Sequence, residues 1–124
     1  MSKKTFKAIL VDAIKREVYA IQTTSDVDQL NKLIGSQTYS GGPRLPNRDG
    51  FLVDDEGMLN LHFGSMFFTF EGYPQPLAGS GLLMGCKANG ETADVKSKLD
   101  EIKAKVKFLT MSEVQAGVAS GEWQ

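Results

Sequence analysis

Apolar and β-branched residues form two short stretches near the start of the chain, at residues 6–11 and residues 18–21. Stretches of this length and composition are typical of β-strands. The connection between them is short and runs from Asp12 to Arg16. Because so short a connection joins strands that run antiparallel, the pattern predicts an antiparallel hairpin.

The next stretch has the features of an amphipathic helix. Ser25 provides a capping hydroxyl, and the acidic side chains of Asp26 and Asp28 complement the positive end of the helix dipole. Gly35 follows the last apolar position and can take the left-handed conformation that ends helices. The apolar face of this predicted helix consists of Val27, Leu30, Leu33 and Ile34.

A second helix is predicted after Asn89-Gly90, with Thr92 as its cap. Its apolar residues have the i, i+4, i+7 and i+11 spacing of one helix face, at Val95, Leu99, Ile102 and Val106. On the opposite face, side chains of opposite charge are spaced i, i+4, as in Asp94 with Lys98 and Glu101 with Lys105. Charges paired in this way indicate a solvated face rather than a nucleic-acid interface.

The middle of the chain is rich in turns, since eleven of its 13 glycines and all four prolines lie between Gly35 and Gly90. Two short apolar stretches, residues 51–53 and 58–61, flank the sequence Asp54-Asp55-Glu56-Gly57. This sequence is predicted to be a hairpin turn that ends on glycine. A calcium loop is the alternative, but such loops spread their oxygen ligands over about twelve residues around a central glycine, a spacing that this sequence lacks.

Three further strands are predicted, at residues 65–70, 81–86 and 107–109. In the first of them, Phe67 faces one side while Phe68 and Phe70 face the other. A strand with two apolar sides is either central in a sheet or part of a subunit contact. Thr110, with Glu113 three residues later, has the pattern of a capping box at the start of a short C-terminal helix.

Together these elements predict one α+β domain spanning residues 1–124. We expect a small, mostly antiparallel sheet of about five to seven strands, two main helices and a short C-terminal helix. Trp123 is the only tryptophan of the chain, and it is expected to pack on its own domain or in a subunit contact. The Trp123 side chain and the apolar strand faces together predict a homo-oligomer.

Composition excludes several classes of partner. The 14 Lys and Arg residues nearly balance the 15 Asp and Glu residues and leave a net charge of -1, whereas nucleic-acid-binding proteins have a strong basic excess. No apolar run approaches the roughly 18 residues that cross a membrane. Cys86, the only cysteine, lies in an apolar run and is expected to be a small buried hydrophobe. An unpaired cysteine and the lack of a signal-peptide pattern predict a cytoplasmic protein.

The chain lacks the residues that most enzyme classes need. Structural zinc requires about four Cys or His ligands, but the chain has one of each, Cys86 and His62. His62 has no nearby Ser or Asp arranged to form a triad, and it is expected to be a half-buried strand residue. We therefore predict a binding protein without catalytic residues, bound metal or cofactor.

The most informative segment is the loop expected at residues 39–50, which holds two of the three arginines of the chain. Its glycines and prolines are expected to set the path of the loop without secondary structure. The planar forks of Arg44 and Arg48 match the oxygen pairs of phosphates and carboxylates, and Tyr39 adds a flat face for a base or sugar. The alternative is an ordinary surface loop in which Arg48 pairs with Asp49 or with the acidic turn. The candidate ligand-binding residues of this loop are Tyr39, Arg44, Asn47 and Arg48.

A second candidate is the loop at residues 76–81, where the sequence Gly79-Ser80-Gly81 can approach an anion closely through N–H groups and the Ser80 hydroxyl. The loop lacks the lysine and the spacing of a Walker motif, and no strand, GxGxxG loop and helix follow one another in the chain. Ser80 is therefore added to the candidate ligand-binding residues, and a plain turn between two strands is the alternative.

Five segments resemble a known family. They are Phe6-Lys7-Ala8-Ile9-Leu10-Val11-Asp12, Arg16-Glu17-Val18, Asp28-Gln29-Leu30-Asn31-Lys32-Leu33-Ile34-Gly35, Leu52-Val53-Asp54-Asp55-Glu56-Gly57 and Pro76-Leu77-Ala78-Gly79-Ser80-Gly81-Leu82-Leu83-Met84-Gly85. Together they are similar to a family of short proteins of unknown function from bacteriophages, plasmids and integrated elements. The resemblance covers residues 5–109 and consists of turn and strand patterns, so it implies a fold and an origin and assigns no catalytic residue.

A phage origin implies that the chain acts by binding. Our first hypothesis is a sponge, an oligomer that sequesters a small phosphorylated or nucleotide-like immune signal of the host, of a cyclic or ADP-ribose type, without cleaving it. The alternative is an interaction protein that blocks a host defence or restriction enzyme through its surface. A third hypothesis, a hydrolase of such signals, needs a base near the ligand, and the available candidates are His62, Asp54, Asp55 and Glu71.

Overall fold

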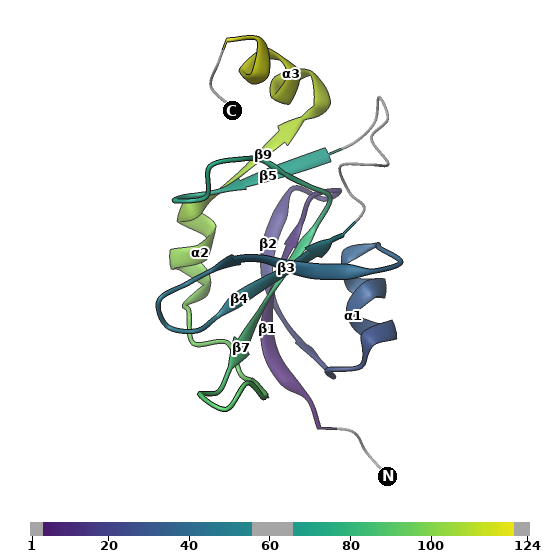
Figure 1. The fold of residues 1–124 in the computed structure, drawn as a ribbon, viewed down its shortest axis with the longest axis vertical. Helices are drawn as coiled ribbons and strands as arrows, with labels where there is room; N and C mark the ends of the chain where they lie inside the picture. The colour runs from purple at the N-terminus through teal and green to yellow at the C-terminus, as the bar shows by residue number, and fades with distance from the viewer. Residues whose placement is uncertain (1–3, 56–65, 121–124) are drawn as a thin grey trace.

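The computed structural model describes residues 4–55 and 66–120 and has the predicted α+β architecture (Figure 1). Nine strands and three helices follow one another in these residues. They are β1 (Phe6–Asp12), β2 (Glu17–Thr23), α1 (Val27–Ile34), β3 (Tyr39–Arg44), β4 (Gly50–Asp54), β5 (Met66–Phe70), β6 (Leu77–Ala78), β7 (Gly81–Cys86), β8 (Thr92–Ala93), α2 (Leu99–Lys105), β9 (Val106–Thr110) and α3 (Met111–Ala119).

The strands form two antiparallel sheets. The larger, six-stranded sheet has the order β2-β1-β7-β4-β3, and β8 pairs with the end of β7. The smaller sheet has the order β6-β5-β9. The predicted hairpin is confirmed, since β1 and β2 pair along their whole length, from Phe6 with Thr23 to Asp12 with Glu17.

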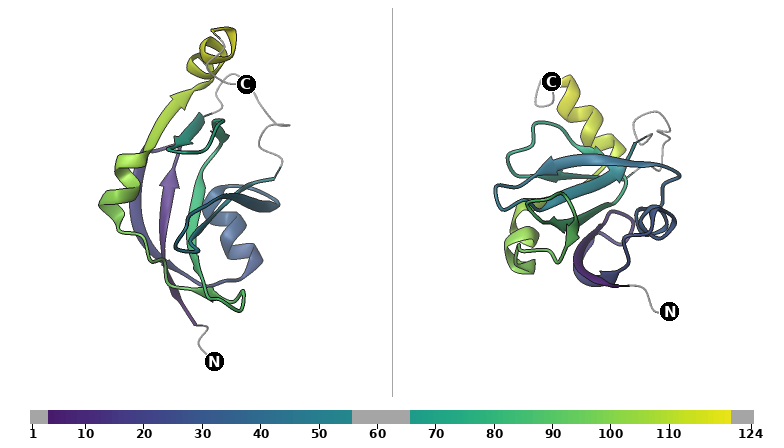
Figure 2. Two further views of the ribbon diagram at one scale, coloured as in Figure 1. Left: turned by 60° about the vertical axis from the view of Figure 1, so that its left-hand side comes forward. Right: turned by 60° about the horizontal axis from the view of Figure 1, so that its bottom comes forward.

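Helices cover the large sheet on both faces (Figure 2). On one face, α1 packs its Leu30 and Ile34 side chains onto apolar residues of β1 and β7. On the other face, α2 contributes Ile102, and the small sheet contributes Phe68 and Phe70 to the same core. The small sheet and α2 therefore act together as the layer that closes this side of the fold.

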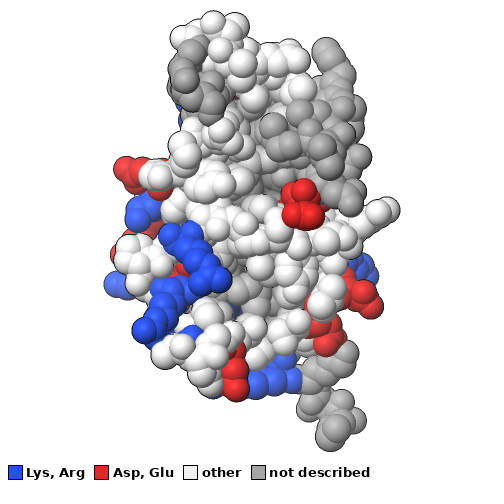
Figure 3. All heavy atoms as spheres, in the orientation of Figure 1, with Lys and Arg blue, Asp and Glu red and all other residues white. Residues whose placement is uncertain are grey.

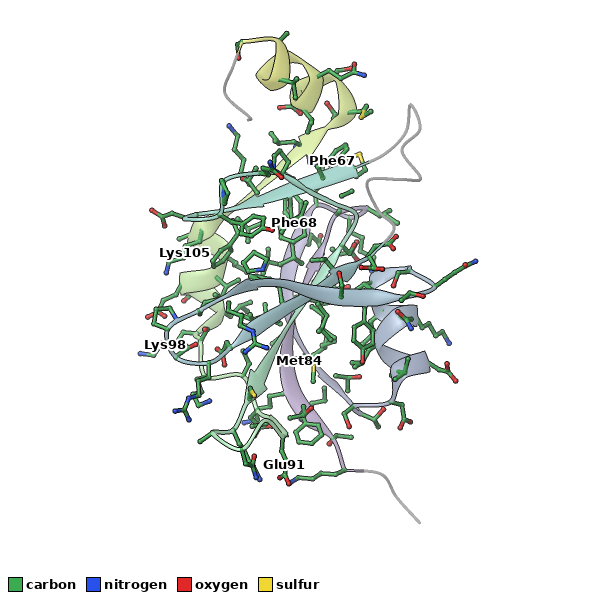
Figure 4. All side chains as sticks on the ribbon, viewed as in Figure 1. Phe67, Phe68, Met84, Glu91, Lys98 and Lys105 are labelled. Carbon is green, nitrogen blue, oxygen red and sulfur yellow. The ribbon has the colours of Figure 1, made fainter. Side chains whose placement is uncertain are left out.

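β5 lies between two cores, which explains its apolar side chains on both sides. Phe68 points into the core shared with the large sheet, whereas Phe67 points to the opposite side, where it packs with Leu109 and Val114 (Figure 4). Both phenylalanines are fully buried within the chain. β5 is thus the central strand of its sheet, and its apolar side chains are covered within the chain, so they give no reason to expect a subunit contact at this strand.

The second predicted helix starts later than its apolar pattern suggested. α2 begins at Leu99, after Lys98 as its N-cap, and ends at Lys105. The expected cap, Thr92, pairs with Cys86 in β8 instead. The last position of the predicted apolar face, at residue 106, is the first residue of β9.

Contacts with distant residues hold the segment before α2 in an extended conformation. The backbone N–H of Lys7 donates to the Asp94 carboxylate at 2.8 Å, and the Val95 N–H donates to the Lys7 carbonyl at 2.9 Å. Gly85 lets the backbone of Asp94 approach β7 closely, because a Cβ atom at residue 85 would overlap the Asp94 carbonyl group. Tertiary contacts therefore keep this segment extended, although the spacing of its apolar residues is typical of a helix.

The ends of the other two helices largely follow the prediction. Gly35 ends α1 in the left-handed conformation, with a φ of 72°. The capping box of α3 is confirmed: the Glu113 N–H donates to the Thr110 hydroxyl at 3.3 Å, and the Thr110 N–H donates to the Glu113 carboxylate at 3.1 Å. At the start of α1, however, the N-cap is Asp26 rather than Ser25.

Four predicted strands are confirmed as β4, β5, β7 and β9. The strand expected at residues 58–61, the end of the acidic turn at Gly57, His62 and Trp123 lie outside the described residues. Across residues 4–55 and 66–120, none of the helices has the length and apolar character needed to span a membrane.

Candidate functional site

A bulge in β3 places Tyr39 and Arg44 on the same face of the large sheet. Gly41 pairs with Leu52 of β4, but Arg44 pairs with Gly50, so the register shifts between Gly41 and Arg44. Because directly paired residues share a face, as do residues two apart on β4, the extra residue turns Arg44 to the face that carries Tyr39. In a regular strand Arg44 would point to the opposite face.

The segment expected to be a loop without secondary structure is therefore largely a β-hairpin. Residues 39–44 form β3, and residues 45–49 form the turn before β4. The Leu45 N–H donates to the Asp49 carbonyl at 2.8 Å and closes the turn. β3 is an edge strand of the sheet, where bulges, glycine and proline are tolerated because one side of the strand has no ladder to maintain.

Arg48 occupies a turn position that usually belongs to glycine. Its φ is 76°, in the left-handed region, and it follows Pro46 and Asn47 in a hairpin turn of the kind that ends on a left-handed residue. This conformation costs a residue with a side chain about 1 kcal/mol. Backbone outliers of this kind cluster at ligand-binding sites, where the side chain has a role that offsets the cost.

The buried carboxylate of Asp49 anchors the turn from below. Asp49 is fully buried and accepts hydrogen bonds from the N–H of Lys96 at 3.0 Å, the N–H of Ser97 at 2.7 Å and the Ser97 hydroxyl at 2.6 Å. The Asn47 side chain completes this network, since its amide donates to the Ser97 hydroxyl and its oxygen accepts from the Asp49 N–H, both at 3.0 Å. The Asp49 carboxylate thus faces residues 96–97 and does not pair with Arg48.

Tyr39, Arg44 and Arg48 line one cavity of about 200 Å³, which we call the arginine cavity. Leu52 of β4 and Met84 of β7 supply apolar lining. Among the described residues that line it are two arginines and no acidic side chain. Figure 3 shows Lys and Arg side chains gathered on this part of the face, over the turn between β3 and β4.

Cys86 lies at the rim of the arginine cavity and is half-buried. It was expected to be fully buried, but the pairing between β4 and β7 ends where Gly50 meets Met84, so the end of β7 extends beyond its neighbour. The Lys96 ammonium donates to the Cys86 carbonyl at 3.0 Å. A third cation therefore lies beside the cavity.

The fold brings together three of the five predicted ligand-binding residues, namely Tyr39, Arg44 and Arg48. The Asn47 side chain is committed to the turn and does not line the cavity. Ser80 lies elsewhere: it is buried at the start of β7, and its hydroxyl accepts from the Ala13 N–H at 3.0 Å. The Ser80 hydroxyl thus supports the β1–β2 turn, and Ser80 does not line the arginine cavity.

Sequence reasoning missed the apolar floor of the site and its far end at Gly90 and Thr92. Part of this floor could have been predicted from the alternation of side chains in β7, because Met84 must lie on the same face as Leu82. The approach of Thr92 to the cavity had no such signal, because it depends on the pairing of β8 with β7.

Three of the four candidate bases of the hydrolase hypothesis lie in the described part of the chain, and none of these three lines the arginine cavity; His62 lies outside the described residues. Asp54 and Asp55 lie at the far end of β4, and Glu71 lines a different cavity. Across residues 4–55 and 66–120, no three His, Cys, Asp or Glu side chains come together in a way that could hold a metal ion.

Comparisons with family models, with curated proteins and with solved structures each find no match to this chain. The similarity to proteins of bacteriophages and plasmids therefore stays a prediction from the sequence, and the geometry of the arginine cavity carries the functional argument.

Proposed function

We propose that this chain binds a small phosphorylated or nucleotide-like ligand in the arginine cavity and holds it without chemical conversion. The observation that carries this proposal is the placement of Arg48. The turn gives a left-handed position to an exposed arginine, and a buried carboxylate holds that turn in place. For the stability of the turn alone, glycine is the more favourable residue at this position.

The chemistry of the cavity fits an anion with an attached flat group. Arg44 and Arg48 offer planar sets of N–H donors that match phosphate oxygens two at a time. Tyr39 and Met84 provide aromatic and apolar surface for a base or sugar. Without an acidic side chain in the described lining, the positive charge of the arginines is not offset locally.

Sequestration follows from binding without a catalytic group, and it agrees with the origin that the sequence resemblance implies. In this proposal the chain is a phage or mobile-element protein that acts in the host cytoplasm and removes a nucleotide-type immune signal. Capture of the ligand intact distinguishes this function from hydrolysis.

The test starts with the protein purified from cells, because a tightly held ligand is expected to co-purify. Heat release followed by mass spectrometry should show a phosphorylated small molecule. Calorimetric titration with adenosine monophosphate should then give an affinity at least tenfold weaker for R44A and for R48A, because truncating one partner of a desolvated charge pair costs about 2 to 5 kcal/mol.

Two control variants make the titration specific. R48K should recover only part of the affinity, because an ammonium cannot reproduce the planar fork. K98A removes an exposed cation outside the cavity lining and should leave the affinity unchanged. Wild-type affinity in both R44A and R48A would contradict the proposed function.

A second candidate function rests on Ile14, whose side chain is 84% exposed at the β1–β2 turn. The Asp12 carboxylate accepts from the N–H groups of Ile14 and Lys15 at 3.1 and 3.0 Å, so the turn presents this apolar side chain rigidly. An apolar side chain fixed on a turn can act as an anchor for a protein partner, as an interaction protein that blocks a host enzyme requires. Loss of inhibition in I14A, with R48A fully active, would favour this function over ligand capture.

We also propose a second copy of the chain as a partner. β2 lies at one edge of the large sheet, and edge strands offer unpaired N–H and C=O groups for pairing with another strand. Light scattering at micromolar concentration should show a homo-oligomer, and a monomer would contradict this part of the proposal.

A further inference from the structure

Arg44 lines a second cavity on the other side of the β3–β4 hairpin. This cavity has a volume of about 440 Å³ and lies between residues 42–46 and residues 70–73, with Lys105 at the end of α2 as a further wall. We call it the tyrosine cavity after Tyr73. Of the residues that line the tyrosine cavity and the arginine cavity, Arg44 is common to both.

Like the arginine cavity, the tyrosine cavity is lined by cations and an aromatic ring, but it also has one acidic residue. Lys105 adds a second cation beside Arg44, and Tyr73 is 38% exposed, which leaves part of its ring available for stacking. Glu71 is the acidic residue of the described lining, and its carboxylate can accept hydrogen bonds from ribose hydroxyls or an exocyclic amino group.

The wall that carries these side chains is held in place by backbone hydrogen bonds. The Glu71 N–H donates to the Lys105 carbonyl at 2.9 Å, and the Tyr73 N–H donates to the Phe70 carbonyl at 3.0 Å. The first bond joins the turn after β5 to the end of α2, where Lys105 is located (Figure 4). Backbone hydrogen bonds therefore fix the positions of the residues that form this wall of the tyrosine cavity.

The two volumes indicate the size of the ligand. Sites for small molecules usually measure about 300 to 1,000 Å³. The arginine cavity, at about 200 Å³, is below this range, and the tyrosine cavity, at about 440 Å³, is within it, so a ligand that fills both is larger than one that fills the arginine cavity alone. A mononucleotide would occupy one cavity and leave the other unused.

We propose that the two cavities form one bipartite site centred on Arg44 and that its ligand consists of two nucleosides joined through phosphate groups. The phosphates lie at Arg44, between Arg48 on one side and Lys105 on the other, and one nucleoside lies in each cavity, against Tyr39 and Tyr73. Arg44 has five N–H donors, enough to bind oxygens from two phosphates at once. This inference rests on the proposed function of the arginine cavity and specifies its ligand.

Linking two nucleosides makes the second contact intramolecular. Such linkage raises affinity by about 10² to 10⁴ when the linker spans both sites. Diadenosine diphosphate and adenosine monophosphate are compared as probes, because they share one nucleotide and differ in the second, which adds one nucleoside and one phosphate. Calorimetric titration should show diadenosine diphosphate bound at least tenfold more tightly.

Variants of the tyrosine cavity separate the two cavities. Y73A and K105A should each weaken diadenosine diphosphate binding at least fivefold and leave the affinity for adenosine monophosphate unchanged. R48A should weaken both probes. K103A is the matched control for K105A, because Lys103 is exposed on the same helix and does not line the cavity. Amide NMR shifts at residues 42–46 and 70–73 on addition of diadenosine diphosphate give an independent measure.

The outcomes are distinct. Equal affinity for the two probes, with Y73A and K105A like the wild type, would overturn the bipartite site and leave the arginine cavity as a mononucleotide site. Binding of neither probe, or wild-type affinity for adenosine monophosphate in both R44A and R48A, would overturn the proposed function and this inference with it.

Discussion

Arg48 is the residue at which the proposed ligand binding opposes the conformational preference of the backbone. Its φ of 76° is a conformation that glycine adopts without steric cost. R48G is therefore expected to keep the turn and to raise the free energy of unfolding by about 0.5 to 1 kcal/mol, while ligand affinity falls. Urea denaturation and calorimetric titration of the same variant measure the two effects.

Arg16 provides the matched control for this prediction. It also has a positive φ, 57°, in the turn between β1 and β2, and it does not line the arginine cavity. R16G should retain full ligand affinity. A loss of unfolding free energy in R48G as large as that caused by an alanine substitution in the core would mean that the fold needs the arginine side chain at this position. That result would contradict the strain proposed for Arg48.

Asp49 is the residue whose loss should damage the site from a distance. D49A leaves two part-buried N–H groups and a hydroxyl without their acceptor, and each group left unsatisfied costs about 1 to 3 kcal/mol. We expect the free energy of unfolding to fall by about 3 kcal/mol or more. The free energy of unfolding of D49N should fall less, because the amide oxygen of the new side chain still accepts a hydrogen bond from Lys96 or Ser97. Chemical denaturation measures both variants, and a loss below about 1 kcal/mol in D49A would contradict the anchoring role.

At the scale of elements, the start of α3 should respond to pH. The Thr110 N–H bonded to the Glu113 carboxylate lowers the pKa of that group below its ordinary value, and the Thr110 hydroxyl contributes to the shift. A lowered pKa means that the ionised carboxylate is favoured in the folded chain. The stabilisation is therefore fully present above the pKa that Glu113 has in the unfolded chain, and it is lost as pH falls through the lower, folded value.

Hydrogen exchange of the first-turn amides of α3 should therefore speed up as the pH falls through the folded pKa of Glu113, after correction for intrinsic exchange rates. E113Q lacks the ionisable group, so its corrected exchange at these amides should not change over the same pH interval. A pH response in E113Q equal to that of the wild type would assign the effect to other carboxylates.

At the scale of the whole molecule, Phe68 joins the two sheets. It is fully buried in the core between them, and Gly81 of β7 leaves room for its ring, since a Cβ atom there would lie 2.7 Å from Phe68 Cζ. F68A should lower the free energy of unfolding by about 3 to 5 kcal/mol, the usual cost of deleting a buried aromatic side chain. V27A, at a side chain that is 58% exposed, should change it by less than about 0.5 kcal/mol.

The same core predicts cooperative unfolding. If the two sheets share it, amides of β1 and β5 should lose protection in one transition in urea. Two separate transitions would show that the small sheet folds independently.

Short-range interactions let the sequence alone determine several elements. Three features depend on residues that are close in sequence, so local patterns predicted them. They are the β1–β2 hairpin, the end of α1 at Gly35 and the capping box at Thr110. The two-sided character of β5 was also predicted, because alternation assigns faces without reference to partners. For the candidate site, the residue types of Tyr39, Arg44 and Arg48 selected a segment whose side chains line one cavity in the structure.

The tertiary structure decided what depends on distant partners. The late start of α2 depends on distant partners: Lys7 binds Asp94 and Val95, and Asp49 binds the N–H of Lys96 across 47 positions of sequence. The shared face of Tyr39 and Arg44 requires a bulge whose register is set by pairing with β4. Local patterns contain no information about such pairings, because a hydrogen bond between distant segments forms only after the rest of the chain has brought them together.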